Sequence, residues 1–218
     1  MFILYRAVLF DFDGTLADTL PLLFFSFKQV FRKYAGRELS EQDILDLFGP
    51  TEDGLLEKMI DKDKLDEAAA EFYHLYEDRH AKYVMPQPEI EQILRDLKER
   101  GLRLGVFTGK GKKSAEISMK RLGLEHFFDA IITGDDVAHP KPAPDGIHQA
   151  IEQMRVSPSD IIFVGDSDAD VQAARSAGVK VIAVKWLTPQ TVDHKVAPDY
   201  LVKDVVEFRE VIHTLGIL

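Results

Sequence analysis

The 218-residue sequence predicts an α/β protein in which a helical segment interrupts a parallel sheet. From residue 89 onward, short β-branched runs alternate with helical patterns, as they do where crossover helices join parallel strands. Residues 16–85, in contrast, show helical periodicity and no convincing strand. We therefore expect an α/β core formed by residues 1–15 and 86–218, and a helical cap formed by residues 16–85.

The cap is expected to contain several helices. Thr19 and Ser40 can each cap one, and Ser40 does so within a capping-box pattern completed by Asp43. After Thr19, apolar side chains recur at helical spacing, at Leu20, Phe24, Phe27, Phe31 and Tyr34. Further helices are expected at residues 52–60 and 64–84. These helices are interrupted at Gly49-Pro50 and closed by Pro86 and Pro88.

The core is expected to alternate strands with helices. Apolar runs predict strands at residues 6–10, 102–107, 129–132, 160–164 and 179–184, with a last strand at 199–202. Helical patterns predict helices at residues 89–100, 113–122, 144–154, 168–177 and 204–214. This order predicts a parallel sheet.

Composition excludes several classes of function. The chain carries 27 Lys and Arg against 37 Asp and Glu, a net charge of -10 that disfavours broad binding to nucleic acid or anionic membrane. It has no cysteine, which excludes disulfides, thiol nucleophiles and cysteine zinc sites. The apolar start lacks a cleavage pattern, and the stretch 20–27 is too short to span a membrane. We expect a cytoplasmic monomer or homodimer that acts on a small molecule.

Polar residues follow four of the predicted strands. The first strand leads into Asp11-Phe12-Asp13-Gly14-Thr15, and the second into Thr108-Gly109-Lys110-Gly111. Pro140-Lys141-Pro142 comes shortly after the third strand, and Gly165-Asp166 with Asp170 follows the fourth. Ligands bind outside the carboxyl ends of the strands in an open parallel sheet, so we expect these residues to meet in one crevice.

Asp11 and Asp13 are residue types that can carry out phosphoryl transfer. Two carboxylates at the end of a buried strand repel each other and lose hydration, a cost that a hard cation such as Mg²⁺ would offset. A carboxylate at Asp11 can attack phosphorus, and Asp13 can protonate the leaving oxygen. Taken alone, the same five residues also fit a strand-ending turn with Gly14 in an unusual conformation.

The other motifs can support such a reaction. Backbone N–H groups around Gly109 can hold a phosphate oxygen at a helix N-terminus, where Lys110 raises the local potential. Lys141 lies between two prolines and can offset the charge of the transferring phosphoryl group. Asp166 and Asp170 are one helical turn apart, and one or both can hold the cation.

The four motifs, in this order and spacing, resemble those of the haloacid dehalogenase (HAD) superfamily, and the chain is similar to its phosphoglycolate phosphatase-like subgroup. The resemblance implies a Rossmann-like HAD core with an all-α cap inserted after the first motif. It implies Asp11 as nucleophile and Mg²⁺ ligand, and Asp13 as general acid and base with its backbone carbonyl on Mg²⁺. Thr108 and Lys141 would hold the phosphoryl group, Asp166 would bind Mg²⁺, and Asp170 would ligate it or support Lys141.

The presence of Asp13 distinguishes between activities of the family, because its dehalogenases lack this second aspartate. We therefore expect a Mg²⁺-dependent phosphatase that hydrolyses a small phosphorylated metabolite through an aspartyl-phosphate intermediate. Inorganic pyrophosphatases and β-phosphoglucomutase-like phosphotransferases of the same family are alternatives, and a catalytically inactive binding protein is an alternative of another class.

The cap loop at residues 48–54 is expected to select the substrate. Glu52 and Asp53 are acidic, whereas phosphoglycolate would call for a cation. We therefore expect Thr51 and Glu52 to select the substrate, with Glu52 recognising hydroxyls or an amine, although Glu52 and Asp53 also suit the start of a helix. The aromatic residues Phe24, Phe25, Phe27 and Phe31 are expected in the cap core, and His74, His80, His139 and Trp186 in packing or solvated positions.

Overall fold

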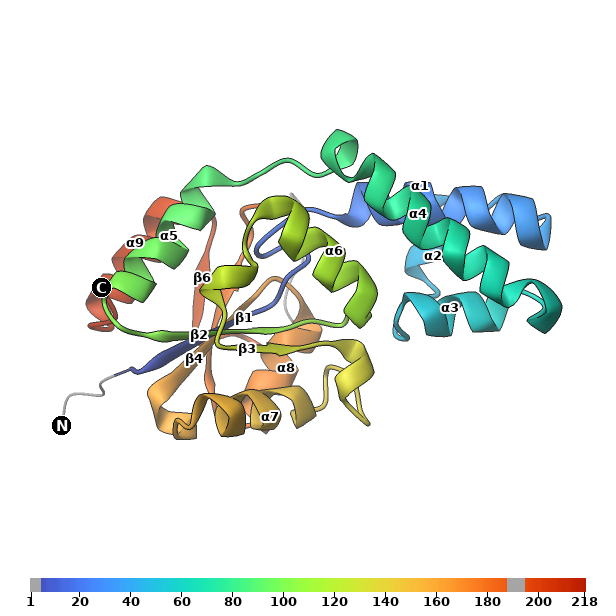
Figure 1. Cartoon of the computed structure of the whole chain (residues 1–218). Helices are drawn as coiled ribbons and strands as arrows, with labels where there is room; N and C mark the ends of the chain where they lie inside the picture. The colour runs from blue at the N-terminus through green and yellow to red at the C-terminus, as the bar shows by residue number, and fades with distance from the viewer. Residues whose placement is uncertain (1–4, 188–194) are drawn as a thin grey trace.

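The computed structural model describes residues 5–187 and 195–218, and its centre is a six-stranded parallel sheet (Figure 1). The strand order is β3-β2-β1-β4-β5-β6. The strands are β1 (Ala7–Phe10), β2 (Arg103–Phe107), β3 (Ala130–Ile132), β4 (Ile161–Gly165), β5 (Lys180–Val184) and β6 (Tyr200–Val202). The predicted parallel α/β fold class is thereby confirmed, and every predicted strand lies within two residues of an observed one.

β1 lies at the point where the strand order reverses. It pairs with β2 on one side and with β4 on the other, so Phe10 lies beside Val106 and Val164. All four residues of β1 are buried, because the strand has a neighbour on each side and helices cover both faces of the sheet. The carboxyl end of such a strand is where open parallel sheets bind ligands.

Helices cover both faces of the sheet through two apolar clusters. On one face Val8, Phe10 and Val106 pack against the helices α5 (Pro88–Glu99), α6 (Lys112–Leu122) and α9 (Val205–Thr214). On the other face Leu9 and Phe163 pack against α7 (Asp145–Met154) and α8 (Asp168–Ser176). Alternate residues of β1 therefore face opposite clusters, as the pleat of a strand requires.

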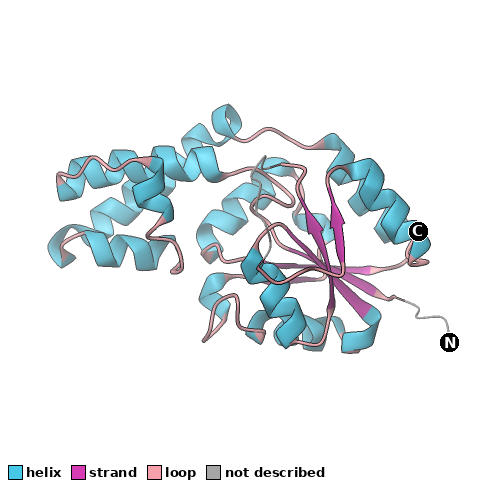
Figure 2. Cartoon of the chain, turned by 180° about the vertical axis from the view of Figure 1, so that it is seen from behind, coloured by secondary structure: helices cyan, strands magenta, loops and turns pink. Residues whose placement is uncertain are grey.

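The segment between β1 and α5 forms a group of helices to one side of the sheet, as the two opposite views in Figures 1 and 2 show. These helices are α1 (Leu20–Val30), α2 (Glu41–Leu45), α3 (Glu52–Met59) and α4 (Leu65–Tyr83), and α1 ends in a π-helical turn, Phe31–Ala35. Short 3₁₀ turns occur at Lys62–Lys64, Glu125–Phe127, Gly134–Asp136 and Pro158–Asp160. Phe24, Phe27 and Phe31 are buried between these helices, as expected, and Phe25 stacks on Tyr83. Within residues 5–187 and 195–218, every helix is too short or too polar to cross a bilayer.

Local signals in the cap are confirmed with one exception. Ser40 and Asp43 form the expected capping box at the start of α2. Thr19 stands at the N-cap of α1 but makes no capping hydrogen bond, and its hydroxyl donates to Asp13 instead. The prediction of Thr19 as a side-chain cap was therefore wrong. Its hydroxyl oxygen accepts from Lys110 Nζ at 3.2 Å instead of from a backbone N–H, and its backbone is in the αR region rather than the extended conformation usual at an N-cap.

Candidate active site

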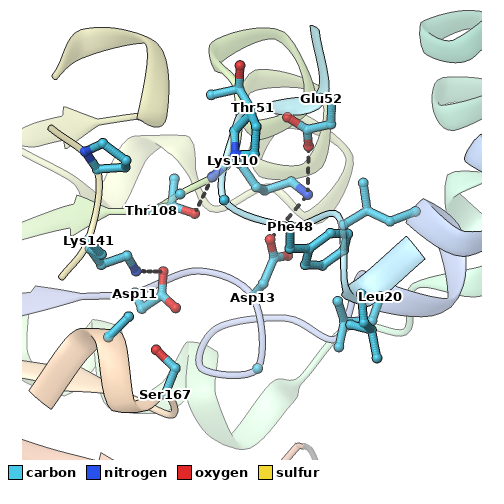
Figure 3. Close-up of a pocket in the computed structure, with 18 of the residues that line it drawn as sticks. Asp11, Asp13, Leu20, Phe48, Thr51, Glu52, Thr108, Lys110, Lys141 and Ser167 are labelled. Atoms are coloured by element: carbon cyan, nitrogen blue, oxygen red, sulfur yellow. Dashed lines mark hydrogen bonds and ion pairs between the residues drawn. The ribbon is translucent and has the colours of Figure 1, made fainter. Parts of the chain in front are cut away.

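A cavity of about 360 Å³ lies between the carboxyl ends of the central strands and the cap (Figure 3). A volume in this range is typical of small-molecule sites. Its core side is formed by residues that the sequence singled out, namely Asp11, Asp13, Thr108, Gly109, Lys110, Lys141 and Asp166. Its cap side is formed by α1 and by the segment 45–55. Strands far apart in the chain therefore bring the predicted motifs into one place.

Asp11 and Lys141 form an ion pair at the base of this cavity. Lys141 Nζ lies 2.8 Å from Asp11 Oδ1 and 2.7 Å from Asp170 Oδ1, and the lysine side chain is only 9% exposed. Burial alone would lower the pKa of Lys141, but Asp11 and Asp170 outweigh this effect and raise it, so the ammonium stays charged. The proline-flanked loop thus places a fixed cation next to the carboxylate at the end of β1.

Asp170 is held on both of its oxygens. Its Oδ1 accepts from Lys141, and its Oδ2 accepts from the backbone N–H and the hydroxyl of Ser167 at 3.0 and 2.6 Å. Gly165 leaves room for this arrangement, because a Cβ there would lie 2.6 Å from the Asp170 Cγ. Of the two roles implied for Asp170, these contacts favour the support of Lys141.

Asp11, Asp166 and Asp170 form the carboxylate cluster of the site, with one oxygen from each within 4.8 Å of the others. Burial and the negative charge of neighbouring aspartates raise the pKa of Asp11 to about 7 and that of Asp166 to about 8. Such shifts mean that the positive charge around the carboxylates is too small for all of them to be ionised together at neutral pH. Oxygen donors gathered in this way fit a hard divalent cation such as Mg²⁺.

Asp13 has a different environment, although it is only two residues from Asp11. One of its oxygens accepts from Thr19, and the other lies 3.2 Å from Lys110 Nζ. Its side chain therefore points toward the cap, away from the carboxylate cluster (Figure 3). The turn between β1 and α1 depends on Gly14, which has a φ of +76° and whose Cβ would overlap the Asp166 carboxylate.

Thr108 follows β2 and is almost fully buried. Its backbone N–H donates to Ile132, and its hydroxyl oxygen accepts from the backbone N–H of Lys110 at 3.2 Å. Gly109 is exposed beside it, at the start of the turn that leads into α6. A hydroxyl and a glycine-rich turn thus line the cavity, and the expected phosphate-binding role of Thr108 and Gly109 stays a prediction.

Lys110 and Glu52 connect the core to the cap. Lys110 Nζ lies 3.4 Å from Glu52 Oε1 and 3.2 Å from Asp13 Oδ2, and its side chain is 2% exposed. Glu52 also accepts hydrogen bonds from the Gly111 N–H and the Ser114 hydroxyl, both at 2.6 Å. The prediction that Glu52 recognises a substrate hydroxyl or amine is not supported by this geometry, because both of its oxygens already bind the core.

Thr51 also contacts the core. A Cβ added to Gly134 would come within 2.6 Å of the Thr51 methyl group, and one added to Gly111 would come within 2.8 Å of Glu52 Oε2. The small residues Gly111 and Gly134 therefore allow the start of α3 to approach the core closely. Thr51 lines the cavity as well, so its expected role in substrate selection stays a prediction.

Several residues at the cap–core contact were not identified from the sequence. Ser118 of α6 lies 2.9 Å from the Tyr76 hydroxyl and 3.2 Å from His80 Nε2, both on α4. Lys113 lies 4.2 Å from the centre of the Tyr73 ring. The helical spacing of Tyr73, Tyr76 and His80 is a signal for one buried face of α4, but it does not name the partner helix.

The remaining candidates, Trp186, His139 and His74, lie in packed or exposed positions outside the cavity lining. The indole N–H of Trp186 donates to the Thr15 carbonyl at 2.8 Å, and its ring packs edge-on against Phe208. Trp186 thus supports the turn that carries Asp13. His139 is exposed and lies 2.9 Å from an Asp145 oxygen, and His74 is exposed on α4. Neither of these two histidines is among the residues that line the cavity.

The fold and the site define a class of α/β protein in which aspartate carboxylates and a buried lysine gather at the carboxyl end of the central strand. Comparison with known proteins agrees with this class. The family model for haloacid dehalogenase-like hydrolases matches residues 8–184, and the chain belongs to this family.

Similar proteins include enzymes and solved structures of known fold. A pyrophosphatase PpaX from Bacillus cereus is 32% identical over 181 residues, 83% of each chain. A predicted phosphoglycolate phosphatase from Haemophilus somnus superposes with a TM-score of 0.81 at 24% identity, covering 95% of this chain and 97% of its own. CbbY from Rhodobacter sphaeroides, solved with phosphate, gives a TM-score of 0.82 at 23% identity, over 94% and 96% of the two chains. The chain is thus an HAD-type phosphatase.

Proposed function

We propose that the protein is a Mg²⁺-dependent phosphatase that hydrolyses a small phosphorylated metabolite through an aspartyl-phosphate intermediate. The observation that carries this proposal is the position of Asp11. Its carboxylate lies at the end of the central strand, faces the cavity, and is adjoined by Lys141 and by the carboxylates of Asp166 and Asp170. Asp11, Asp166 and the backbone carbonyl of Asp13 would hold Mg²⁺, which supplies positive charge against the phosphoryl oxygens when it is bound.

The residues of the chain would divide the reaction between them. The Asp11 carboxylate attacks phosphorus, a P–O bond to Asp11 forms, and the bond to the leaving oxygen breaks. Asp13 gives that oxygen a proton, then takes one from the water that hydrolyses the aspartyl-phosphate. Lys141 and Thr108 hold the phosphoryl oxygens, since a buried ammonium and a hydroxyl can stabilise the charge that spreads over them. The cap excludes water during the first step.

The wider setting of the enzyme belongs to the same proposal. A net charge of -10 and the absence of cysteine favour a cytoplasmic enzyme that acts on a small phosphate rather than on nucleic acid or a membrane. The relatives named as pyrophosphatases make inorganic pyrophosphate a second candidate substrate. Monomer and homodimer both fit the proposal.

Substitution of the nucleophile tests the mechanism. Asp11→Asn removes the attacking carboxylate while keeping its shape, so hydrolysis of an aryl phosphate with Mg²⁺ should fall by about 10³-fold or more. Chelation by EDTA should abolish turnover by the wild type. Asp18→Asn is the matched control, because Asp18 lies in the same loop but does not line the cavity, and it should stay within a few-fold of wild type.

Full activity of the Asp11→Asn variant would contradict the mechanism. Failure of the wild type to hydrolyse any member of a broad panel of phosphate esters and pyrophosphate would favour a binding protein instead.

A further inference from the structure

The cap wall of the cavity is apolar. Among the described residues it is built mainly from side chains without charge, namely Leu20, Leu23, Phe27, Leu45, Phe48 and Leu55. Because the core residues hold the phosphoryl group in the proposed function, this wall faces the rest of the substrate. The part of the substrate beyond its phosphate therefore meets hydrocarbon and aromatic surface.

Phe48 is the most distinctive residue of this wall. It is 40% exposed, although most of the large apolar side chains among the described residues are buried or partly buried. Its ring stacks against Phe24 at 6.5 Å between centroids, and it lines the cavity, as Leu20 does (Figure 3). An aromatic ring left partly open at the edge of a cavity gains most from covering by another apolar group.

The two cations that line the cavity among the described residues, Lys110 and Lys141, are already paired with carboxylates. Lys110 contacts Asp13 and Glu52, and Lys141 contacts Asp11 and Asp170. Glu52 is the one charged residue that the cap contributes to the lining, among the residues described, and it binds the core. Lys141 faces the phosphoryl group in the proposed function, and Lys110 is held by Asp13 and Glu52, so neither of these lining cations is left to meet a negative charge on the leaving group.

We infer that the substrate is a phosphate monoester of an uncharged, largely apolar alcohol, with an aromatic or branched aliphatic group against Phe48. This inference rests on the proposed phosphatase function and names its substrate class. An anionic leaving group would lose hydration against the apolar wall without gaining a partner, and the cost of such burial is large. Pyrophosphate and phosphoglycolate both leave behind an anionic product group and are disfavoured for this reason.

A pair of matched substrates tests the inference. Benzyl phosphate and 4-carboxybenzyl phosphate share the reacting phosphoryl group and the ring, and differ by one remote negative charge. With Mg²⁺ present, kcat/KM for benzyl phosphate should exceed that for 4-carboxybenzyl phosphate, and for pyrophosphate, by about 100-fold. A rate for pyrophosphate or the carboxylated ester that equals or exceeds the benzyl phosphate rate would overturn the inference.

Two variants at Phe48 test whether the cap wall causes the preference for benzyl phosphate over 4-carboxybenzyl phosphate. Phe48→Lys places an ammonium at the edge of the cavity, and should raise the ratio of carboxybenzyl to benzyl turnover by about tenfold or more. Phe48→Leu is the control, because it keeps an apolar side chain and should leave the ratio near the wild-type value. A ratio that does not differ between the two variants would contradict the assignment of the wall.

The wild type alone also decides the question, should the Phe48→Lys variant fail to fold. Benzylphosphonate should inhibit it at a concentration about tenfold or more below that needed with 4-carboxybenzylphosphonate, and the reverse order would contradict the inference. The two proposals fail in different ways. If anionic substrates are preferred and Asp11→Asn abolishes that activity, the phosphatase mechanism stands and only the substrate class is wrong.

Discussion

Glu52 illustrates how a single side chain can take a role that its sequence context does not reveal. It is acidic, it lies in the loop that faces the cavity, and it begins a helix, so both substrate recognition and a favourable helix-dipole position fit the sequence. In the folded chain its carboxylate is 5% exposed and binds Lys110, Gly111 and Ser114. Its charge therefore stabilises the contact between the cap and the core.

Removing the charge of Glu52 should destabilise the folded protein. Glu52→Gln keeps the size of the side chain but leaves Lys110 buried with one carboxylate fewer, so the free energy of unfolding should fall by about 1–3 kcal/mol in denaturant titrations. Glu57→Gln, on the exposed side of the same helix, should change it by less than about 0.5 kcal/mol. Equal losses in the two variants would show that the Glu52 contacts add no stability.

At the scale of elements, the contact between α4 and α6 joins the cap to the core. Tyr76 and His80 of α4 converge on Ser118 of α6, and all three side chains are buried. Burial lowers the pKa of His80 to about 4, and the positive charges of Arg121 and Lys110 act in the same direction. His80 is therefore neutral in the folded protein at neutral pH, which suits its hydrogen bond with a hydroxyl.

The pKa of His80 predicts how this contact responds to acid. Because the unfolded chain takes up the proton near pH 6.5 and the folded chain only near 4, the stabilising contribution is present above pH 6.5 and is lost as pH falls toward 4. The added slope is at most about 1.4 kcal/mol per pH unit. Thermal or denaturant unfolding between pH 7 and 4 should show a shallower dependence in His80→Gln than in the wild type.

His74→Gln provides the matched control for that experiment. His74 is exposed on the same helix, so its replacement should leave the acid dependence of stability unchanged. An acid dependence that is the same in the His80 and His74 variants would mean that His80 is not the titrating group.

At the scale of the whole molecule, the active site is complete only when the cap lies against the core. The cavity has one wall from the sheet ends and one from the cap, and Gly111 and Gly134 set how closely the two approach. A methyl group at Gly111 would lie 2.8 Å from Glu52 Oε2 and 3.2 Å from Asp135 Oδ2. A methyl group added at this contact should therefore displace the whole cap from the core.

The variant Gly111→Ala tests this coupling between the two parts. It should shift the population toward open forms, seen as a larger radius of gyration in small-angle scattering, and lower kcat/KM by about 10- to 100-fold. For scattering, Gly109→Ala is the control, since a Cβ there meets no atom within 4 Å. A scattering profile of Gly111→Ala identical to that of the control would contradict a tight contact at this glycine.

The sequence by itself determined the order of strands and helices. It also predicted a helical insertion and named site candidates that lie at the strand ends, namely Asp11, Asp13, Thr108, Lys141, Asp166 and Asp170. It could do so because strand and helix patterns are local, and because the carboxyl ends of parallel strands meet at one edge of the sheet. Tertiary structure alone decided that Glu52 binds Gly111, 59 positions away in the core, and that Tyr76 and His80 of α4 meet Ser118 of α6. These partners depend on how separate helices dock, and no local pattern encodes which side chain will stand opposite another across such a contact.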